Sequence, residues 1–434
     1  MSVDMKDSGI AWIGEIPRHW KVSAIKRNLQ LYSGATPKTD NEEYWNGNIA
    51  WITPADYKTE DRWIEQGSRY ITDKGFKSCA VSILPKGSVI FSKRAPIGLV
   101  VMNSSPLCTN QGCIGCIPLT GNGSFYYYAM SICTEQFELL GSGTTFKEIS
   151  ATSFANFLLP TPSIVEQSLI ANFLDKKCTE IDELIALQDQ MIAQLTTYKQ
   201  AVITETVTKG LDPNVKMKDS GVEWIGEIPE HWDFIPLKYL GRTQNGISKG
   251  GDYFGEGYPF VNYGDIYKNY FIGSNDASGL AKSTIEDQKN YSVVKGDVFF
   301  TRTSETIEEI GFSCACIETI KNATFSGFLI RFRPYPEVLY PLFSGFYFRS
   351  TMHRQYFVKE MNIVTRTSLG QDLLKGLPVL LPPLSEQQSI ANYLDQKCKE
   401  IDELISVKKE KIEQLKAYKK SVIYEYVTGK KQVN

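Results

Sequence analysis

The chain has 434 residues, a formal net charge of −2 and a hydrophobic content of 42%. This length predicts two to four domains with enough apolar material for their cores, and the composition is ordinary for a soluble globular protein. The near-zero charge does not by itself indicate a nucleic-acid partner, although a balanced total can conceal a local basic patch.

Targeting and metal-binding signals are weak. The opening residues MSVDMKDSGI show no basic stretch followed by an apolar one, and no run of about 18 apolar residues occurs, so we expect a cytoplasmic protein without a membrane span. Cys113 and Cys116 are spaced like half of a zinc site, but no second CxxC or paired histidine accompanies them. We expect the nine cysteines to be reduced core residues and expect no metal site.

Residues 1–20 form the first predicted segment, and its sequence occurs twice. Residues 5–20 read MKDSGIAWIGEIPRHW and residues 217–232 read MKDSGVEWIGEIPEHW, so 13 of 16 positions are identical. This match at an offset of 212 indicates an internal duplication. Asp-Ser-Gly and the following proline predict an irregular turn in each copy, with its tryptophans packed on an apolar surface.

Residues 21–163 are predicted to form a first globular domain. Short apolar runs bounded by Pro and Gly predict strands, and two longer stretches predict helices before an extended exit. The expected strands are Ile49–Ile52, Ser88–Phe91, Gly98–Met102 and Cys113–Pro118; the expected helices are Gly123–Leu140 and Ser150–Asn156; the exit is Leu158–Pro162.

Residues 164–209 are predicted to form a long helix. Residues 166–208 contain no Gly or Pro, and apolar side chains recur in steps of three and four from Ile170 to Val202. At about 1.5 Å per residue, this helix is roughly 60 Å long. A narrow apolar stripe of this length needs a second long helix to bury it.

The chain contains such a second helix. Residues 210–232 hold the second Trp-rich segment, residues 233–383 a second globular domain, and residues 384–434 the second long helix. Its apolar stripe repeats the first at an offset of 220, and 15 of its first 20 residues from Glu386 are identical. We expect the two helices to pack on each other. If the halves are related by a pseudo-twofold axis, residues 5–20 lie at the end of the second helix and the termini are adjacent.

Catalytic signatures are missing from the sequence. It contains no GxxxxGK[ST] phosphate loop, no GxGxxG after a strand, no HExxH and only three histidines. The chain is therefore predicted to be a binding subunit and not an enzyme.

Candidate DNA contacts are basic, amide and aromatic residues in the loops of both domains. Arg and Lys suit phosphates and guanine, amides suit adenine, and Tyr can stack on bases. An isolated Lys-Arg pair is typical of solvated surface. However, Lys93-Arg94 and Arg302 both follow a Lys-Gly-x-Val-x-Phe sequence, and this matched placement favours DNA contact and solvated surface equally. The candidates are Lys38, Thr39, Thr53, Tyr57, Lys58, Lys93, Arg94, Gln111, Thr145 and Lys147 in the first domain, and Lys249, Tyr263, Lys268, Arg302 and Arg366 in the second.

The whole chain resembles the specificity subunit of type I restriction–modification enzymes. The resemblance rests on the duplicated EQxxIANxLDxKCxEIDELI and DSGxxWIGEIPxHW sequences, on SKRAPIG and NQGC, and on the LLPTP and LLPPL exits. It implies an α+β fold with two pseudo-twofold-related α/β target-recognition domains, separated by two long antiparallel helices that form a coiled coil.

The resemblance also implies a function. Each domain would read one half of a bipartite double-stranded DNA target, and the helices would set the unread spacer. Two methyltransferase (M) subunits would hold S-adenosylmethionine and methylate adenines, and restriction/translocase (R) subunits would use ATP and Mg. No cofactor is expected in this chain. The acidic helix clusters are interpreted as partner-docking surfaces: Glu180, Asp182, Glu183, Glu400, Asp402 and Glu403.

Two alternatives remain at this point: a specificity subunit of a modification-only or other related restriction system, and a coiled-coil protein-binding adaptor. The second domain also departs from the first. Thr301-Arg302-Thr303 stands where the first domain has Ser92-Lys93-Arg94, and Phe325-Ser326-Gly327 is aligned with Asn110-Gln111-Gly112. Contacts are therefore harder to transfer to the second domain.

Overall fold

The structure is a computed structural model that describes residues 4–57, 61–143, 147–222, 224–304, 309–353, 356–357 and 367–433. The chain divides into two compact units: Met1–Gln188 with Glu410–Asn434, and Asp189–Lys409. Among the described residues, no helix is long and apolar enough to cross a membrane. All nine cysteines are free, and all except Cys79 are buried. The expectation of reduced core cysteines is confirmed for these eight.

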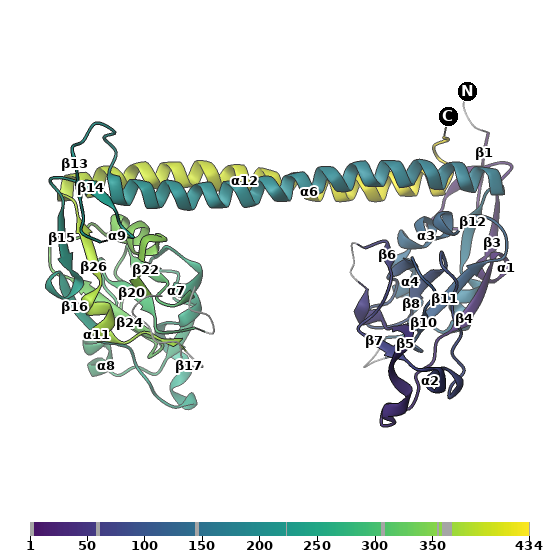
Figure 1. Ribbon diagram of the computed structural model, residues 1–434, viewed down its shortest axis with the longest axis horizontal. Helices are drawn as coiled ribbons and strands as arrows, with labels where there is room; N and C mark the ends of the chain where they lie inside the picture. Colours follow the sequence, from purple (N-terminus) through teal and green to yellow (C-terminus); the bar gives the residue numbers. More distant parts are fainter. Residues whose placement is uncertain are drawn as a thin grey trace. The chain divides into compact units, whose positions relative to one another are not determined.

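The first unit is built around a five-stranded sheet in the order β4–β11–β8–β9–β6. Its pairs are antiparallel except β6–β9, which is parallel. Strands β4, β6, β8 and β11 of this sheet are labelled in Figure 1. Three of the five strands confirm the expected ones to within two residues at either end. The strands are β4 (Leu29–Ser33), β11 (Cys113–Pro118), β8 (Val89–Ser92), β9 (Val100–Asn103) and β6 (Trp63–Ile64).

A second, three-stranded sheet in the first unit has the order β10–β5–β7. Strand β5 pairs parallel with β10 and antiparallel with β7. Its end, residues 49–52, was expected to be a strand; the strand begins earlier, at Trp45. The bounds are β10 (Cys108–Thr109), β5 (Trp45–Ile52) and β7 (Arg69–Ile71), with the short helix α2 (Asp73–Lys77) following.

Helices join this domain to the long-helix pair. The long helices are α6 (Ile164–Lys209) and α12 (Leu384–Val427), and Leu174 of α6 and Val422 of α12 share a core with Phe125 and Phe154. The helix expected over 123–140 is two helices, because the chain breaks at Ile132-Cys133. The shorter helices are α1 (Ile25–Asn28), α3 (Gly123–Ser131), α4 (Thr134–Leu139) and α5 (Ala151–Asn156), and β3 (Lys21–Ala24) pairs with β12 (Leu158–Thr161).

The segment 5–20 is a small hairpin, so the expectation of an irregular turn was wrong. Strands β1 (Met5–Asp7) and β2 (Glu15–Pro17) pair antiparallel around the turn that Ser8 and Gly14 close. Trp20 is buried, as expected. The hairpin lies at the end of α12: the Tyr424 hydroxyl donates to the carbonyl of Trp12 at 3.1 Å, and the Lys430 amine donates to the carbonyl of Ile13 at 2.5 Å. The adjacency of the two chain ends is thus confirmed.

The second unit repeats the first strand by strand. Its five-stranded sheet has the order β16–β24–β20–β22–β18 and its three-stranded sheet β19–β17–β23, with parallel pairs at the same places. Hairpin β13–β14 repeats β1–β2, and β15–β26 repeats β3–β12. The bounds are β13 (Met217–Asp219), β14 (Glu227–Pro229), β15 (Asp233–Pro236), β16 (Gly241–Asn245), β17 (Phe254–Val261), β18 (Phe271–Ile272), β19 (Gly279–Ala281), β20 (Val298–Thr301), β22 (Ser313–Cys316), β23 (Thr324–Phe325), β24 (Leu329–Pro334) and β26 (Pro378–Leu381).

Apart from the long helices described above, the remaining elements of the second unit are short. They include α7 (Tyr263–Lys268), α8 (Ile285–Asn290), α9 (Pro341–Arg349), α11 (Gln371–Gly376) and the two-stranded ladder β21 (Thr303–Ser304) with β25 (Thr367–Ser368). Helices α6 and α12 run antiparallel, because Asp182 pairs with Lys419, whereas Lys199, which comes later in α6, pairs with Asp402, which comes earlier in α12. The expected α+β fold with a duplicated domain and antiparallel long helices is confirmed.

Candidate nucleic-acid interface

Five loop segments of the first unit, residues 34–36, 52–54, 92–94, 110–112 and 147–149, meet in what we call loop cluster 1. They hold half of the ten predicted contacts of this domain, although they are distant in sequence. Backbone hydrogen bonds join them in a chain: Ala35 N–H to Thr109 O at 3.0 Å, Asn110 N–H to Ile52 O at 2.9 Å, Lys93 N–H to Gly112 O at 2.8 Å, and Ile149 N–H to Lys93 O at 3.1 Å. The fold therefore gathers these residues on a rigid frame.

The basic part of loop cluster 1 is organised around one carboxylate. Glu148 accepts an ion pair from Lys93 at 2.8 Å and another from Arg94 at 3.3 Å. The hydrogen bond from Lys93 is the main cause of the lowered pKa of Glu148. Lys147 is exposed, and with Arg94 it lines a cavity of about 830 Å³ that Glu138 borders. The three cations are Lys93, Arg94 and Lys147, and the two carboxylates are Glu138 and Glu148. The local charge is therefore positive, which suits a phosphate.

The polar part of loop cluster 1 presents an amide. Gln111 is exposed, and its side-chain oxygen accepts a hydrogen bond from the Thr36 hydroxyl. Lys38 and Thr39 are exposed in the loop that follows Thr36. The Thr53 hydroxyl instead donates to Asp56 at 2.9 Å and caps a turn, so it has a structural partner already. The predicted DNA contacts of these residues remain predictions.

Tyr57 occupies a different position from the one the sequence suggested. Only 7% of it is exposed, and its hydroxyl donates to Cys113 Sγ at 3.1 Å. Burial raises the pKa of Tyr57 well above its usual value. Its ring is a core element and cannot stack on a base while the domain is folded. The candidates Lys58, Thr145 and Arg366 lie outside the described residues.

The second unit has an equivalent cluster of residues 246–248, 261–263, 301–303, 326–328 and 367–369, which we call loop cluster 2. The same four bonds recur: Ile247 N–H to Phe325 O at 2.9 Å, Ser326 N–H to Val261 O at 3.0 Å, Arg302 N–H to Phe328 O at 2.9 Å, and Leu369 N–H to Arg302 O at 2.7 Å. This pattern confirms that Arg302 matches Lys93. It corrects the alignment of the neighbouring loop by one residue: Asn110 matches Ser326, and Gly112 matches Phe328.

The remaining candidates of the second domain differ in their surroundings. Tyr263 follows the cap residue Asn262, so it matches Pro54 and not Tyr57, and it stacks on Tyr267 with ring centroids 5.8 Å apart. Lys249 is ion-paired with Asp287 at 3.0 Å. Lys268 is exposed at the end of α7. Ser368 stands where the first domain has Glu148, and within the described residues Arg302 has no ion pair.

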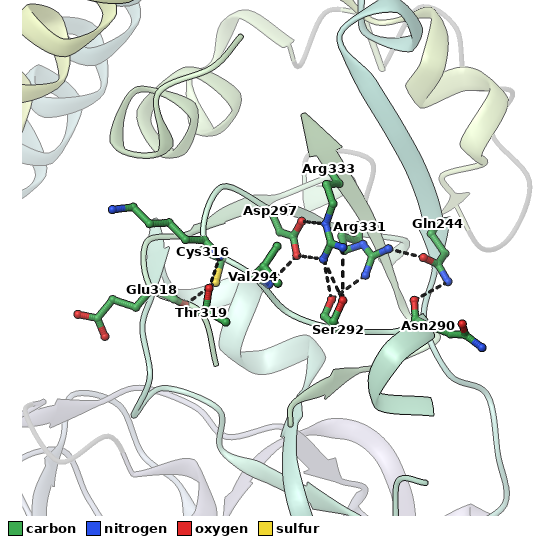
Figure 2. A network of polar contacts seen from close by, with 11 residues as sticks. Gln244, Asn290, Ser292, Val294, Asp297, Cys316, Glu318, Thr319, Arg331 and Arg333 are labelled. Carbon is green, nitrogen blue, oxygen red and sulfur yellow. Dashed lines mark hydrogen bonds and ion pairs between the residues drawn. The ribbon is translucent and has the colours of Figure 1, made fainter. Parts of the chain in front are cut away.

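A polar network fixes strand β24, which leads out of loop cluster 2. Arg333 holds Asp297 through two contacts of 2.6 Å, and Arg331 donates to the carbonyl of Ser292 at 2.6 Å and to the side chain of Gln244. Figure 2 shows Ser292 lying between the two guanidinium groups. Burial lowers the pKa of Arg331 to about 10, so it stays charged at neutral pH. The matching strand of the first domain carries Gly115 and Ile117, so this network belongs to the second domain alone.

The family of the chain follows from comparison with known proteins. The model of the type I restriction modification DNA specificity domain matches residues 17–197 and again residues 229–416. The chain belongs to this family. The two matches correspond to the two target-recognition domains of a type I specificity subunit.

Relatives and solved structures agree with the family. The chain is 31% identical over 317 residues to the MjaIX specificity subunit of Methanocaldococcus jannaschii, which covers 68% of this chain and 69% of the relative. It is 25% identical to the putative MjaX specificity subunit of the same organism, over 97% of this chain and 96% of the relative.

Among solved structures, a chain from a study of assembly and conformational transition of the type I R-M system superimposes with a TM-score of 0.71 at 14% identity, covering 95% of this chain and 98% of the other. The HsdS subunit of Thermoanaerobacter tengcongensis gives a TM-score of 0.52 at 15% identity and the same coverage. At these identities the likeness shows the fold.

The acidic residues of this specificity subunit are not all available to a partner. Asp182 and Asp402 pair with lysines of the other long helix, and Glu180 and Glu400 pair with the lysine three residues before them. Glu183 and Glu403 are exposed.

Sequence reasoning missed an apolar surface beside these residues. Exposed apolar side chains occur on the helices in two sets related by the offset of 220, a signal that the duplicated sequence already contained. The sets are Leu184, Leu187 and Tyr418, and Leu404, Val407 and Tyr198.

Proposed function

We propose that this specificity subunit reads a bipartite double-stranded DNA target, with one half-site for each unit. The observation that carries the proposal is the pair of loop clusters, which share four backbone hydrogen bonds but differ in their side chains. A fixed backbone with variable side chains is what two readers of different base sequences require, because base edges are discriminated by side-chain chemistry.

The two clusters favour different bases. Loop cluster 1 presents the Gln111 amide beside Lys93 and Arg94, a combination suited to adenine and guanine edges and to phosphates. Loop cluster 2 presents Arg302, and Ser368 stands at the position from which Glu148 holds Lys93 in loop cluster 1. The half-site read by the second unit is therefore expected to differ in sequence from that read by the first.

We propose that catalysis resides in partner subunits and that this chain supplies recognition. The sequence lacks the phosphate loop and the other catalytic motifs that methylation and ATP-driven restriction require. M subunits would hold S-adenosylmethionine and methylate adenine, and R subunits would use ATP and Mg to translocate and cut. A chain that alone transferred a methyl group to DNA would contradict this division.

The long helices are proposed to act as a spacer. Helix α6 is continuous over 46 residues and passes from the first unit into the second. Half-sites about one helical turn apart lie roughly 34–36 Å apart along DNA. A helix pair of fixed length would set this distance, and the bases between the half-sites would be spanned without being read.

Two M subunits are the partners that the helix surfaces favour. Leu184, Leu187 and Tyr418 have the same chemistry as Leu404, Val407 and Tyr198, and exposed apolar groups of this kind mark protein interfaces when they cluster. Two equivalent surfaces on one chain suit two copies of one partner.

Methylation-sensitive sequencing of DNA modified by the assembled complex tests the proposal directly. We expect one bipartite motif with a methylated adenine in each half. Replacing Gln111 with Ala should relax the motif at one base pair of a single half-site, while Gln30→Ala, an exposed amide on β4, should leave it unchanged. A protein-binding adaptor would show no sequence-dependent, salt-sensitive DNA binding.

A further inference from the structure

Phe328 is an exposed aromatic residue at the centre of loop cluster 2. It lies between β23 and β24, and 61% of it is exposed to solvent. Leaving a large apolar ring in water gives up free energy that burial would provide. The neighbouring Phe325 and Leu329 are fully buried, so the chain turns this one ring outward between two core residues.

The backbone around Phe328 is fixed before any ligand binds. Its carbonyl accepts from the Arg302 N–H at 2.9 Å, and the N–H of Gly327 donates to Ile247 O at 2.8 Å. A Cβ at Gly327 would lie 2.1 Å from the Ser248 hydroxyl oxygen and 2.9 Å from the Ile247 carbonyl oxygen, so a larger residue would require a shift of this loop. The network around Arg331 holds the strand that follows. The ring is therefore presented by a rigid support.

The equivalent position in loop cluster 1 has no side chain. Gly112 stands there, and the amide of Gln111 occupies the adjacent position, which in the second unit is Gly327. In this loop each domain therefore carries one large side chain, and the two side chains occupy neighbouring aligned positions. One is a hydrogen-bonding amide and the other is an apolar ring.

We propose that Phe328 contacts the C5-methyl group of a thymine in the half-site that the second unit reads. The methyl group of thymine is the apolar group that base pairs present in the major groove, so it is the feature that an outward phenyl ring in a reading loop recognises. Phe328 is a specificity-determining residue in this assignment. The inference rests on the proposed function.

Deoxyuridine substitution tests the contact, because deoxyuridine pairs like thymidine but lacks the methyl group. The complex of this chain with its methyltransferase partner would bind duplexes that carry the methylation motif, with each thymine of the second half-site replaced in turn. We expect one position where the wild-type complex loses about fourfold in affinity, the factor for one buried methyl group. Phe328→Ala should bind the thymine duplex about as weakly as wild type binds the deoxyuridine duplex.

Matched variants make the outcome decisive. Phe328→Leu should keep the sensitivity to the methyl group, and Tyr335→Ala, which removes another exposed aromatic of the second unit (44% exposed), should leave it unchanged. Wild-type affinity that is unchanged by deoxyuridine at every thymine of the second half-site overturns the inference. So does equal deoxyuridine sensitivity in Phe328→Ala, or a loss of affinity for all duplexes that ignores the methyl group. A wild-type complex without any sequence preference would instead contradict the proposed function.

Discussion

Lys199 of α6 donates to both carboxylate oxygens of Asp402 in α12, at 2.8 and 2.7 Å. Lys419 does the same to Asp182, at 2.7 and 2.6 Å, and each residue of this second pair is its counterpart at the offset of 220. The residue numbers of both pairs add to 601, so α6 and α12 have the same antiparallel register in both units. Asp182 and Asp402 thus serve helix pairing.

Charge reversal should reveal this pairing. Lys199→Glu places two carboxylates together and is expected to lower stability by about 0.2–1 kcal/mol, the range of exposed ion pairs. Adding Asp402→Lys should restore most of the loss, which a double-mutant cycle on the unfolding midpoint measures. Glu183→Lys, at an exposed position of α6, is the control and should leave the midpoint unchanged. Strictly additive effects would show that the two side chains do not interact.

Partner docking should depend on the apolar sets and not on Asp182. Leu184→Asp and Leu404→Asp are each expected to remove one M subunit from the complex, and the double variant both, because a buried unpaired carboxylate is costly. Native mass spectrometry counts the subunits. Leu119→Asp, which alters an exposed leucine of a loop, is the matched control. Full assembly of the double variant would place the docking surface elsewhere.

Glu166 should make the first unit sensitive to acid. Its carboxylate accepts from Ser163, from His19 at 2.7 Å and from the Trp20 indole at 2.9 Å. Burial opposes ionisation, but these hydrogen bonds lower its pKa from 4.5 to about 2. Between these two pKa values the carboxyl of Glu166 binds more protons in the unfolded chain than in the folded chain. The stabilisation is therefore complete above pH ~5 and is lost as the pH falls towards 2.

Glu166→Gln tests that pH dependence. At pH 7 the variant is expected to lose about 1.5–3 kcal/mol, the range for hydrogen bonds to a charged group. The difference from wild type should shrink as the pH falls from 5 to 3 in urea-unfolding series. Glu183→Gln should show no such convergence. A constant difference across this range would exclude the carboxylate as its cause.

The Asp297 network should matter to the second unit only. Asp297 is fully buried, and Asp297→Ser, which introduces the residue of the first domain (Ser88), leaves Arg333 without its partner. We expect a loss of about 2–4 kcal/mol, somewhat below the usual cost of breaking a buried pair because Arg333 is partly exposed. Hydrogen exchange should accelerate in β20 and β24 but not in β8 and β11. Adding Arg333→Ile, after Ile117, should recover part of the loss.

Lengthening the helix pair should lengthen the spacer. Because the register sums to 601, four residues inserted after Gln188 must be matched by four after Ile412. About four residues make one helical turn, so both apolar stripes stay in phase. The methylation motif is expected to keep both half-sites and gain spacer base pairs. An insertion in α6 alone should impair folding. Altered half-site bases in the matched variant would contradict the spacer model.

Sequence periodicity was sufficient for α6 and β11, which have the expected bounds, and for the start of α12; α12 ends at Val427, seven residues before the expected end at residue 434. These elements are defined by local pattern. The residues of the loop clusters were identified as polar or aromatic, but their surroundings depend on distant partners. Glu148 neutralises Lys93 from 55 positions away, and Tyr57 is buried by its contact with Cys113. Phe328 was not identified, because the sequence alignment of this loop with its counterpart in the first domain was wrong by one residue. The strand register decides which loop positions match.

The discontinuous first unit has a consequence for synthesis on the ribosome. The second unit is a continuous stretch, so it can fold while the last residues are still being translated. The core of the first unit needs Val422, Ile423 and Val427, and its hairpin needs Tyr424 and Lys430. Nearly the whole nascent chain must emerge before these contacts form. The part of the protein made first is therefore the part completed last, and until then its apolar surface is exposed to chaperones.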